Sequence, residues 1–228
     1  MTAHVTFTTR AGGVSDAPYA ELNLGHHVGD DPASVGRNRA RLAESLGVGR
    51  VVFMHQVHGR DIAVVDGGTP DVVEGVDVLM TTTPGLAIGV LVADCVPIAL
   101  VADGGAAVVH AGRRGMQSDV VTAAVEALAA REAGPLRAFV GPAICGRCYE
   151  VPPDMQADVA AAVPVARCTT SRGTTGLDLK AGVVSQLQRA GVVDITVDPA
   201  CTAEDARYFS HRRDGVTGRF AGVAILTG

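Results

Sequence analysis

The sequence has 228 residues, of which 47% are hydrophobic, and a formal net charge of −5 from 19 basic and 24 acidic side chains. This length suits one large domain or two small ones, with enough residues to bury a substantial core. No block of like charges is present, which argues against binding to nucleic acid or to an anionic membrane surface. No apolar run approaches the roughly 20 residues that a transmembrane helix requires.

The cysteine content and the N-terminal residues indicate the cellular compartment of the protein. Residues 1–13 do not show the basic segment followed by an apolar segment that marks a secretory signal peptide. The chain has five cysteines, which is an odd number and too few for a disulfide-stabilised scaffold. Both observations predict a cytoplasmic protein.

Apolar periodicity and turn-forming residues predict a mixture of strands and helices. Strands are expected at residues 3–9, 51–56, 61–65, 77–83, 86–92, 136–140, 193–197 and 220–226. Helices are expected at residues 31–46, 119–132, 153–163 and 179–190, with Pro32 in a first turn and Asp178 as an N-cap. Strands dominate the first half and helices the second. This favours a mixed α/β or α+β layered fold, with residues 1–228 as a single domain, over repeated βαβ units.

Two pairs of strands are expected to be neighbours. Segments 77–83 and 86–92 form a pair around Pro84-Gly85. Two apolar runs on either side of Asp103-Gly104-Gly105 are expected to be buried strands with a hairpin-like turn.

Reactive side chains gather at the ends of the apolar runs within residues 91–115. Cys95 follows the first of three such runs, and His110 ends the third. Arg113 and Arg114 follow, in a small cationic segment that leads into an expected helix. A buried scaffold that delivers a thiol, an imidazole and guanidinium groups to its edge indicates a functional site.

His58, Cys95 and His110 all lie at the ends of strand-like runs, and two interpretations of them remain open. Two imidazoles and one thiolate make a three-ligand set with room for a water molecule, which is the open arrangement of a catalytic zinc. The alternative is a buried cysteine that packs as a small hydrophobic residue, with histidines that bond to the backbone. Their spacing matches no zinc-finger or HExxH pattern and does not decide between the two.

Cys145 and Cys148 form a CxxC pattern. A redox pair would require a helix that begins just after the first cysteine, but the flanking residues indicate loop and strand. A structural zinc site would require a second CxxC, which the sequence lacks. The pattern therefore favours ordinary thiols in a loop.

Arginines at both ends of the chain form a candidate anion site. Arg212 and Arg213 precede the last expected strand, and adjacent residues of an extended chain point in opposite directions, so one of them is expected to reach a site. The alternative is a solvated turn with a surface ion pair. Together with Arg10 and Arg114 they suggest a phosphate or carboxylate clamp. Neither a Walker loop nor GxGxxG after a strand is present, which argues against a nucleoside triphosphate or dinucleotide cofactor.

A series of ordered blocks extends along nearly the whole chain. The blocks are Thr9-Arg10 with Gly12-Gly13-Val14-Ser15, Leu22-Asn23-Leu24-Gly25, Val28-Gly29-Asp30, Asn38-Arg39, Gln56-Val57-His58-Gly59, Ala93-Asp94-Cys95-Val96-Pro97, His110-Ala111-Gly112, Gly141-Pro142-Ala143-Ile144, Tyr149-Glu150-Val151 and Ser210 with Arg212-Arg213. Together they resemble the YfiH-like family, also called the laccase-domain or multicopper polyphenol oxidase family, whose members are assigned as purine nucleoside phosphorylases. The resemblance implies a layered α/β sandwich like that of the deamidase domain of the cytotoxic necrotizing factor toxins, which use a Cys-His pair.

The resemblance also implies a site. In the family, the histidine of QVHG, the cysteine of ADC and the histidine of HAGWRG form a zinc-binding catalytic cluster, which corresponds to His58, Cys95 and His110. Zinc is the expected cofactor, with copper as an adventitious ligand only. A purine nucleoside and phosphate are the expected small-molecule partners, and a monomer or small homo-oligomer is expected. The residues expected to contact nucleoside or phosphate are Arg10, Asn23, Arg114, Tyr149, Glu150, Arg212 and Arg213.

The chain departs from the family pattern at two positions. HAGWRG reads His110-Ala-Gly-Arg113-Arg114-Gly, and the chain has no Trp, so an aromatic surface is replaced by a second cation. Cys145 stands where the family usually has a small residue.

Three classes of function follow. Phosphorolysis of adenosine or inosine leads, with adenosine deamination as a further activity of a zinc site. The alternative is a metal-free cysteine amidase that edits peptidoglycan precursors, with Cys95 as nucleophile and His110 as base. A non-catalytic partner of the division or wall machinery has no sequence feature in its favour. Laccase chemistry requires roughly ten histidines in His-x-His pairs, whereas this chain has seven and no such pair, so copper oxidation is not expected.

Overall fold

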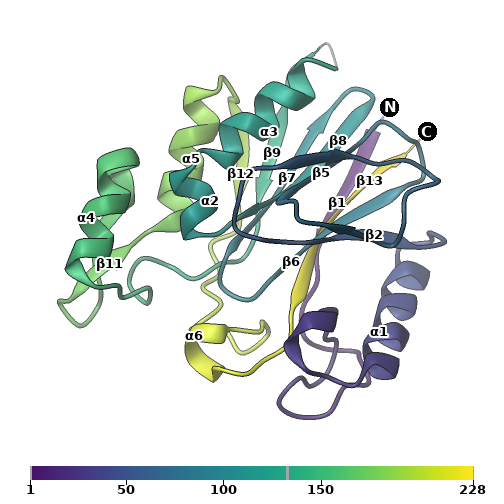
Figure 1. Ribbon diagram of the computed structural model, residues 1–228, viewed down its shortest axis with the longest axis horizontal. Coiled ribbons are helices and arrows are strands. Elements are labelled where there is room, and N and C mark those ends of the chain that lie inside the picture. The colour runs from purple at the N-terminus through teal and green to yellow at the C-terminus, as the bar shows by residue number, and fades with distance from the viewer. Residues whose placement is uncertain (1, 132–133, 228) are drawn as a thin grey trace.

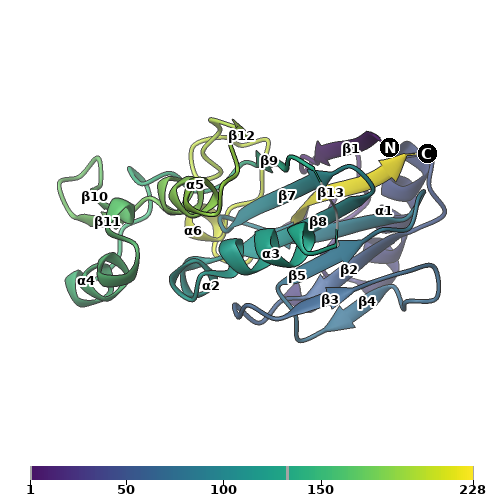
Figure 2. The same cartoon turned by 90° about the horizontal axis from the view of Figure 1, so that it is seen from above.

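The computed structural model describes residues 2–131 and 134–227. Two β-sheets pack face to face, and helices cover the outer face of each sheet (Figures 1 and 2). The layers therefore run helix, sheet, sheet, helix, which confirms the layered α/β sandwich expected from the sequence.

Both sheets mix parallel and antiparallel strands. The first has the order β1 (Thr2–Phe7), β13 (Phe220–Thr227), β6 (Ala87–Val92), β2 (Val51–His55) and β4 (Val72–Glu74). The second has the order β12 (Asp194–Val197), β9 (Arg137–Val140), β7 (Val96–Ala102), β8 (Gly105–Ala111), β5 (Val78–Thr81) and β3 (Ile62–Val64). A separate ribbon pairs β10 (Arg167–Thr169) with β11 (Thr175–Leu177), and it lies with α4 at the end of the molecule away from the two termini (Figure 2).

The helices are short. They are α1 (Pro32–Ser45), α2 (Arg113–Gln117), α3 (Val120–Ala129), α4 (Pro153–Ala162), α5 (Leu179–Arg189) and α6 (His211–Asp214), with 3-10 turns η1 (His26–Val28) and η2 (Pro164–Ala166). As expected, Pro32 begins α1, and the carboxylate of Asp178 caps α5 by accepting from the Ala181 amide at 2.9 Å. The expected helix 119–132 ends at Ala129, and residue 132 lies outside the described residues. No helix within the described residues is long and apolar enough to cross a membrane.

The alternation of side chains along the strands separates three apolar layers. Val108 of β8 points between the two sheets, where it packs with Phe220 and neighbouring residues. Its neighbour Val109 points to the opposite face, into the layer beneath α3 and α5. Successive residues of a strand face opposite sides, so one continuous apolar run fills both layers. The third layer, under α1, contains Leu42 and Phe53.

The expected pairing of segments 77–83 and 86–92 is wrong. β5 pairs with β8 and β3 in the second sheet, whereas β6 pairs with β13 and β2 in the first. Pro84-Gly85 does interrupt the chain, but the connection passes from one sheet to the other. Both strands are buried along their whole length, so their sequences do not indicate which sheet each one joins.

The β7–β8 hairpin is confirmed, and it positions the candidate site. Its antiparallel register places Val96 opposite Ala111 and Pro97 opposite His110, so the residues just outside this end also become neighbours. At the other end the turn uses Gly104 at φ 96°, a conformation that favours glycine. The hairpin thus brings Cys95 next to His110 and Gly112, although they lie at opposite ends of the two strands in the sequence.

Candidate active site

His58, Cys95 and His110 form one cluster at the end of the sandwich. Their ligating atoms all lie within 4.8 Å of one another. The distance from His58 Nε2 to Cys95 Sγ is 3.9 Å, and the two imidazole rings meet edge to face with centroids 4.7 Å apart. The structure therefore brings together, from three separate segments, the three residues that the sequence singled out.

Asp77 is the buried residue that holds both histidines in place. Its carboxylate accepts a hydrogen bond of 2.7 Å from His110 Nδ1 and further bonds from the backbone amides of Val57, His58 and Gly59, at 3.2, 3.0 and 2.7 Å. Burial acts against the charged carboxylate, but the hydrogen bonds from His110 and Gly59 outweigh it, and the pKa of Asp77 is lowered. His58 itself adopts φ 62°, in the left-handed region. The hydrogen bonds that the three backbone amides donate to Asp77 stabilise this conformation.

The backbone before Cys95 is also strained. Asp94 adopts φ 94°, which a non-glycine residue rarely does. Its carboxylate accepts a 2.6 Å bond from the Thr202 hydroxyl and another of 2.6 Å from the Arg212 amide. These hydrogen bonds fix the turn that precedes Cys95 and orients its thiol. They also attach the segments around residues 202 and 212 to this turn. Two left-handed residues beside one cluster are typical of a functional site.

Gly112 lies against the cluster from the side of α2. A Cβ atom at this position would lie 2.7 Å from His58 Cδ2 and 3.2 Å from Cys95 Sγ. Only glycine leaves room here for the imidazole and the thiol to approach each other.

In the cluster, the surroundings favour a negative charge on Cys95 and a positive charge on His110. Burial acts against a charged thiolate, but the charge and hydrogen bonds of His110 and His58 lower the pKa of Cys95 to about 6. Burial likewise acts against imidazolium, but Cys95 and Asp77 raise the pKa of His110 to about 9. Without a metal ion, the pair is therefore a thiolate and an imidazolium at neutral pH.

The donor set fits a zinc ion. The hydrogen bond to Asp77 places the proton of neutral His110 on Nδ1, which leaves Nε2 free to act as a ligand. A carboxylate that orients a ligating histidine in this way is a common feature of zinc sites. With Cys95 as a thiolate and His58 Nε2 facing it, the cluster offers three protein ligands and an open position.

A cavity of about 370 Å³ opens in front of His58 and Cys95. Its lining residues are His58, Ala93, Asp94, Cys95, Arg113, Arg114, Ile144, Tyr149, Leu179, His211 and Arg212. The cavity therefore combines three guanidinium groups with one aromatic ring, beside the cluster. Arg212 stacks over the Tyr149 ring at 5.0 Å and donates to the Glu150 carbonyl at 2.8 Å. Burial raises the pKa of Tyr149, so its hydroxyl remains protonated at neutral pH.

A second cavity, of about 380 Å³, lies on the other side of the cluster. It shares His58, Cys95 and His211 with the first and adds His110, Gln56, His27 and Arg219. Burial lowers the pKa of His27 to about 4, so its ring is neutral at physiological pH. Burial also lowers the pKa of Arg219, against the attraction of Cys95.

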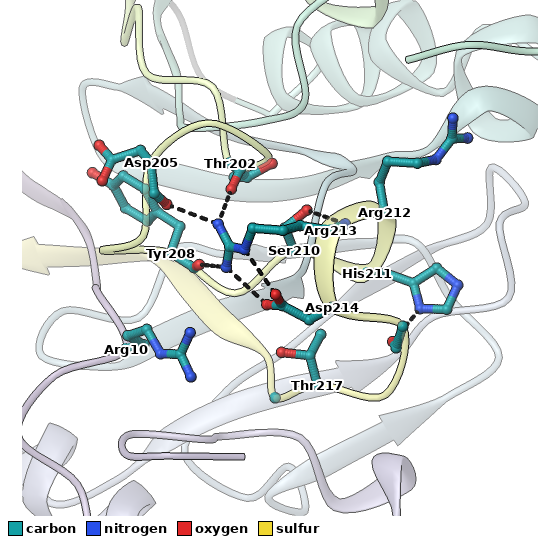
Figure 3. Close-up of polar contacts among 12 residues, drawn as sticks. Arg10, Thr202, Asp205, Tyr208, Ser210, His211, Arg212, Arg213, Asp214 and Thr217 are labelled. Atoms are coloured by element: carbon teal, nitrogen blue, oxygen red, sulfur yellow. Dashed lines mark hydrogen bonds and ion pairs between the residues drawn. The ribbon is translucent and has the colours of Figure 1, made fainter. Parts of the chain in front are cut away.

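Not all of the expected substrate residues reach these cavities. Arg114, Tyr149 and Arg212 line the first cavity. Arg213 points away from Arg212 (Figure 3), and its guanidinium bonds to the Asp214 carboxylate and to the carbonyls of Thr202, Asp205 and Tyr208. The two arginines belong to the short helix α6 and not to an extended chain, but they still diverge as expected.

Three other expected residues make their contacts elsewhere. Arg10 donates from Nε to the Ala20 carbonyl at 2.7 Å and lies over the Phe209 ring. Asn23 is buried and donates to the Asp30 carboxylate at 2.8 Å. The Glu150 side chain forms an ion pair with Arg172.

Sequence reasoning did not assign three residues that the structure places at the site. Asp77 lies just before β5 and has no motif of its own, so only its contacts reveal its role. Arg113 appears in the sequence only as a replacement of the family's Trp, yet it lines the first cavity. His211 lines both cavities and donates from Nδ1 to the Gly215 carbonyl at 2.7 Å, which leaves Nε2 available to a ligand (Figure 3).

Comparison with known proteins extends this description. A family model described as multi-copper polyphenol oxidoreductase laccase matches residues 4–227. A protein named purine nucleoside phosphorylase from Streptomyces griseus is 54% identical, over 98% of this chain and 94% of its own length. One of the same name from Streptomyces coelicolor is 55% identical, over 98% and 96%. The crystal structure of YlmD from Geobacillus stearothermophilus is 38% identical with a TM-score of 0.92, over 99% of this chain and 92% of that one. The matched residues include the whole cluster.

Proposed function

The chain belongs to the multi-copper polyphenol oxidoreductase laccase family, and on that premise we propose that it is a purine nucleoside phosphorylase. In this reaction phosphate attacks C1′ of the ribose, the bond to the purine breaks, and the products are ribose 1-phosphate and the free base. The observation that carries the proposal is the first cavity, where three arginines and a tyrosine surround the open side of the cluster. The names of the two Streptomyces relatives support the same reaction.

Arg113, Arg114 and Arg212 would bind the phosphate. Guanidinium groups remain charged at every physiological pH and match the geometry of phosphate oxygens. Arg212 is held by the Tyr149 ring and the Glu150 carbonyl, so it would meet the anion with little loss of side-chain entropy. We do not retain Arg10, Asn23, Arg213 or the Glu150 side chain in the substrate set, because each is bonded elsewhere.

His211 and Tyr149 would act on the nucleoside. The departing purine requires a proton, and His211 in its imidazolium form would donate one from Nε2 at the cavity, while Nδ1 stays bonded to the Gly215 carbonyl and the ring becomes neutral. The protonated Tyr149 hydroxyl would donate a hydrogen bond to the ribose or the base.

His58, Cys95 and His110 would hold zinc. When bound, the ion would supply a Lewis acid and a fixed positive charge next to the substrate. Asp77 would keep His110 Nε2 and the loop of His58 directed at that position. We do not propose copper oxidation, because the cluster provides only two histidines and one cysteine.

The test is an assay with purified protein and inosine or adenosine, in the presence and absence of phosphate, with chromatography of the products. We expect free base and ribose 1-phosphate only when phosphate is present. Conversion of adenosine to inosine without phosphate would add the deaminase activity. Replacement of His58 or Cys95 by Ala is expected to abolish turnover of the folded protein. No turnover by the wild type under either condition would contradict the proposal.

A metal-free cysteine amidase is the second candidate. The observation that favours it is the thiolate–imidazolium pair of Cys95 and His110, which is the charge state of an activated cysteine nucleophile. The two candidates differ in metal content. Full hydrolytic activity of the metal-free protein on small amides, together with its loss on alkylation of Cys95, would favour the amidase. Stoichiometric zinc at the cluster would oppose it.

A further inference from the structure

A second cluster of metal-binding side chains lies outside the site described above. Cys145, Cys148, Cys201 and Glu204 each offer one ligating atom, and these atoms all lie within 4.8 Å of one another. The CxxC pattern alone favoured ordinary thiols because no second CxxC exists. The structure supplies the third thiol and the carboxylate from a segment more than fifty residues further along the chain.

The backbone around Cys145 directs two thiols to the same place. The amides of Cys148 and Tyr149 both donate to the Cys145 carbonyl at 3.0 Å, which folds the CxxC segment into a tight turn. Gly146 is required inside this turn, since a Cβ atom there would lie 2.8 Å from Cys168 Sγ. Cys168 packs against the outside of the turn and is not part of the cluster.

The surroundings of Cys201 suit a metal-bound sulfur. Its Sγ accepts a hydrogen bond of 3.3 Å from the Cys145 amide, which joins the two segments of the cluster, and the Glu204 amide donates to the Cys201 carbonyl at 3.1 Å. Burial raises the pKa of the Cys201 thiol, so the thiol is protonated when no metal ion is bound. A neutral thiol is a weak acceptor, whereas a thiolate, the form that binds metals, is stabilised by a donor such as the Cys145 amide. Binding of a metal ion would release the proton of this thiol, since a coordinating cysteine is a thiolate.

We propose that Cys145, Cys148 and Cys201, with Glu204 as the fourth ligand, bind a structural zinc ion separate from the His58 cluster. Tetrahedral zinc with bonds of about 2.3 Å holds its sulfur ligands about 3.8 Å apart, so binding requires the observed group to contract by at most about 1 Å. Zinc is favoured over harder cations because three of the ligands are thiolates.

Arg147 would offset part of the negative charge of these ligands. Its Nη2 contacts both carboxylate oxygens of Glu204, at 3.1 and 3.3 Å. Each carboxylate oxygen accepts more than one bond, so this ion pair leaves Glu204 able to coordinate. The buried ammonium of Lys180 bonds to the carbonyls of Asp198 and Ala200, and so fixes the segment that leads to Cys201.

The zinc would join two loops that shape the substrate cavity. One is the segment from Ile144 to Tyr149, both of which line the cavity. The other continues from Cys201 to Thr202, whose hydroxyl bonds to Asp94 next to the catalytic cluster. Zinc at the second cluster would therefore position the cavity wall without touching the substrate. Its loss is expected to raise KM several-fold more than it lowers kcat.

The first experiment measures zinc per chain, by elemental analysis, in protein purified from zinc-supplemented cells without chelators. Cys148→Ser and Cys201→Ser are expected to contain one zinc fewer than the wild type, whatever the His58 cluster holds. Cys168→Ser is the matched control and is expected to keep the wild-type content. Equal zinc in the wild type and Cys201→Ser would overturn the proposal. So would an intact mass two hydrogens below that of the fully reduced chain, because it would show a disulfide in the cluster.

The second experiment does not depend on variants at the second cluster. In His58→Ala/Cys95→Ser the first cluster is disabled, and all of the proposed ligands of the second remain. Cobalt(II) added to this metal-free variant is expected to give the near-ultraviolet charge-transfer band of a cobalt–thiolate site at one equivalent, and zinc is expected to abolish it. Absence of the band in the folded variant would contradict a Cys3Glu metal site.

Discussion

Asp77 and His110 are 33 residues apart in sequence, and they share a buried hydrogen bond of 2.7 Å. The same carboxylate holds three consecutive backbone amides that end at Gly59. One side chain thus fixes the ring orientation of one proposed zinc ligand, His110, and the loop that carries another, His58. The geometry of the cluster depends on this residue as much as on the three groups that face the cavity.

Asp77→Asn is expected to weaken zinc binding 10–100-fold, which is the usual effect of losing such a partner. An asparagine amide can donate to His110 Nδ1, which would shift the proton to Nε2 and block it as a ligand. Competition with a chelating dye measures the affinity, and kcat/KM is expected to fall with it when zinc is limiting. Asp61→Asn, at an exposed neighbouring position, is the control. Equal zinc affinity in both variants would exclude the orienting role of Asp77.

Gly112→Ala is expected to lower kcat/KM at least about tenfold, because its Cβ would lie 2.7 Å from His58 Cδ2 and displace the ring. The backbone at this position, φ −75° and ψ 174°, is open to alanine, so the protein is expected to fold. Gly36→Ala, in α1 and without any neighbour within 4 Å, is the matched control and is expected to stabilise by about 0.5–1 kcal/mol. Measurements of activity and of thermal unfolding on both variants separate the effect on the site from the effect on stability. Wild-type activity of Gly112→Ala would show that close approach of the two ligands is not required.

Arg212→Ala and Arg213→Ala are expected to affect different properties, although the residues are adjacent. Arg212 lines the cavity, so its loss is expected to raise KM for phosphate. Arg213 binds the carbonyls of Thr202, Asp205 and Tyr208, so its loss is expected to cost about 1–3 kcal/mol of unfolding free energy. In a chain of this length that corresponds to a Tm lower by roughly 2–12 °C. Phosphate titrations and calorimetry test both, and a larger KM effect in Arg213→Ala would reverse the assignment.

Alkylation of Cys95 in the metal-free protein is expected to follow the thiolate form. Because the pKa of Cys95 is lowered to about 6, the reaction rate is expected to rise through pH 6 and to level off above it. His110, with its pKa raised to about 9, remains charged over the same range and begins to lose its proton only above it. Cys168, whose pKa is raised by burial, provides an internal reference that reacts only in alkaline solution. Rates are read from the labelled peptides by mass spectrometry. A Cys95 profile with its midpoint near that of Cys168 would contradict the ion pair.

Added zinc is expected to protect Cys95 from alkylation, since a coordinated thiolate is less available to the reagent. Cys95 labelled equally fast with and without zinc would show that this thiol is not a ligand.

The sequence predicted well what is determined locally. The β7–β8 hairpin follows from two apolar runs and a glycine turn, and its register explains why Cys95 and His110 meet. The N-caps of α1 and α5 likewise depend on a few adjacent residues. In each case the interacting groups are close in the chain, so composition and spacing contain the relevant information.

What the sequence did not predict depends on contacts between distant segments. β5 and β6 were expected to pair, but each is buried on both faces and joins a different sheet. Asp77 has the sequence context of an ordinary strand start, and its four hydrogen bonds form only when β5 pairs with β8 and residues 57–59 fold against them. Cys201 is brought next to the CxxC turn by the parallel bridge of its backbone with Ala143, which is distant in sequence.

The turn of the β7–β8 hairpin lies at the far end of two seven-residue strands, about 23 Å from Cys95 and His110. Ala102 pairs with Gly105, so the β7–β8 ladder is complete before the turn begins. The register at the other end, next to Cys95 and His110, therefore does not depend on the residues that connect the strands. The Asp103-Gly104 position is therefore a suitable insertion point for a fluorescent or affinity tag. Such a reporter would be anchored rigidly to the element that carries two of the proposed zinc ligands while remaining remote from the substrate.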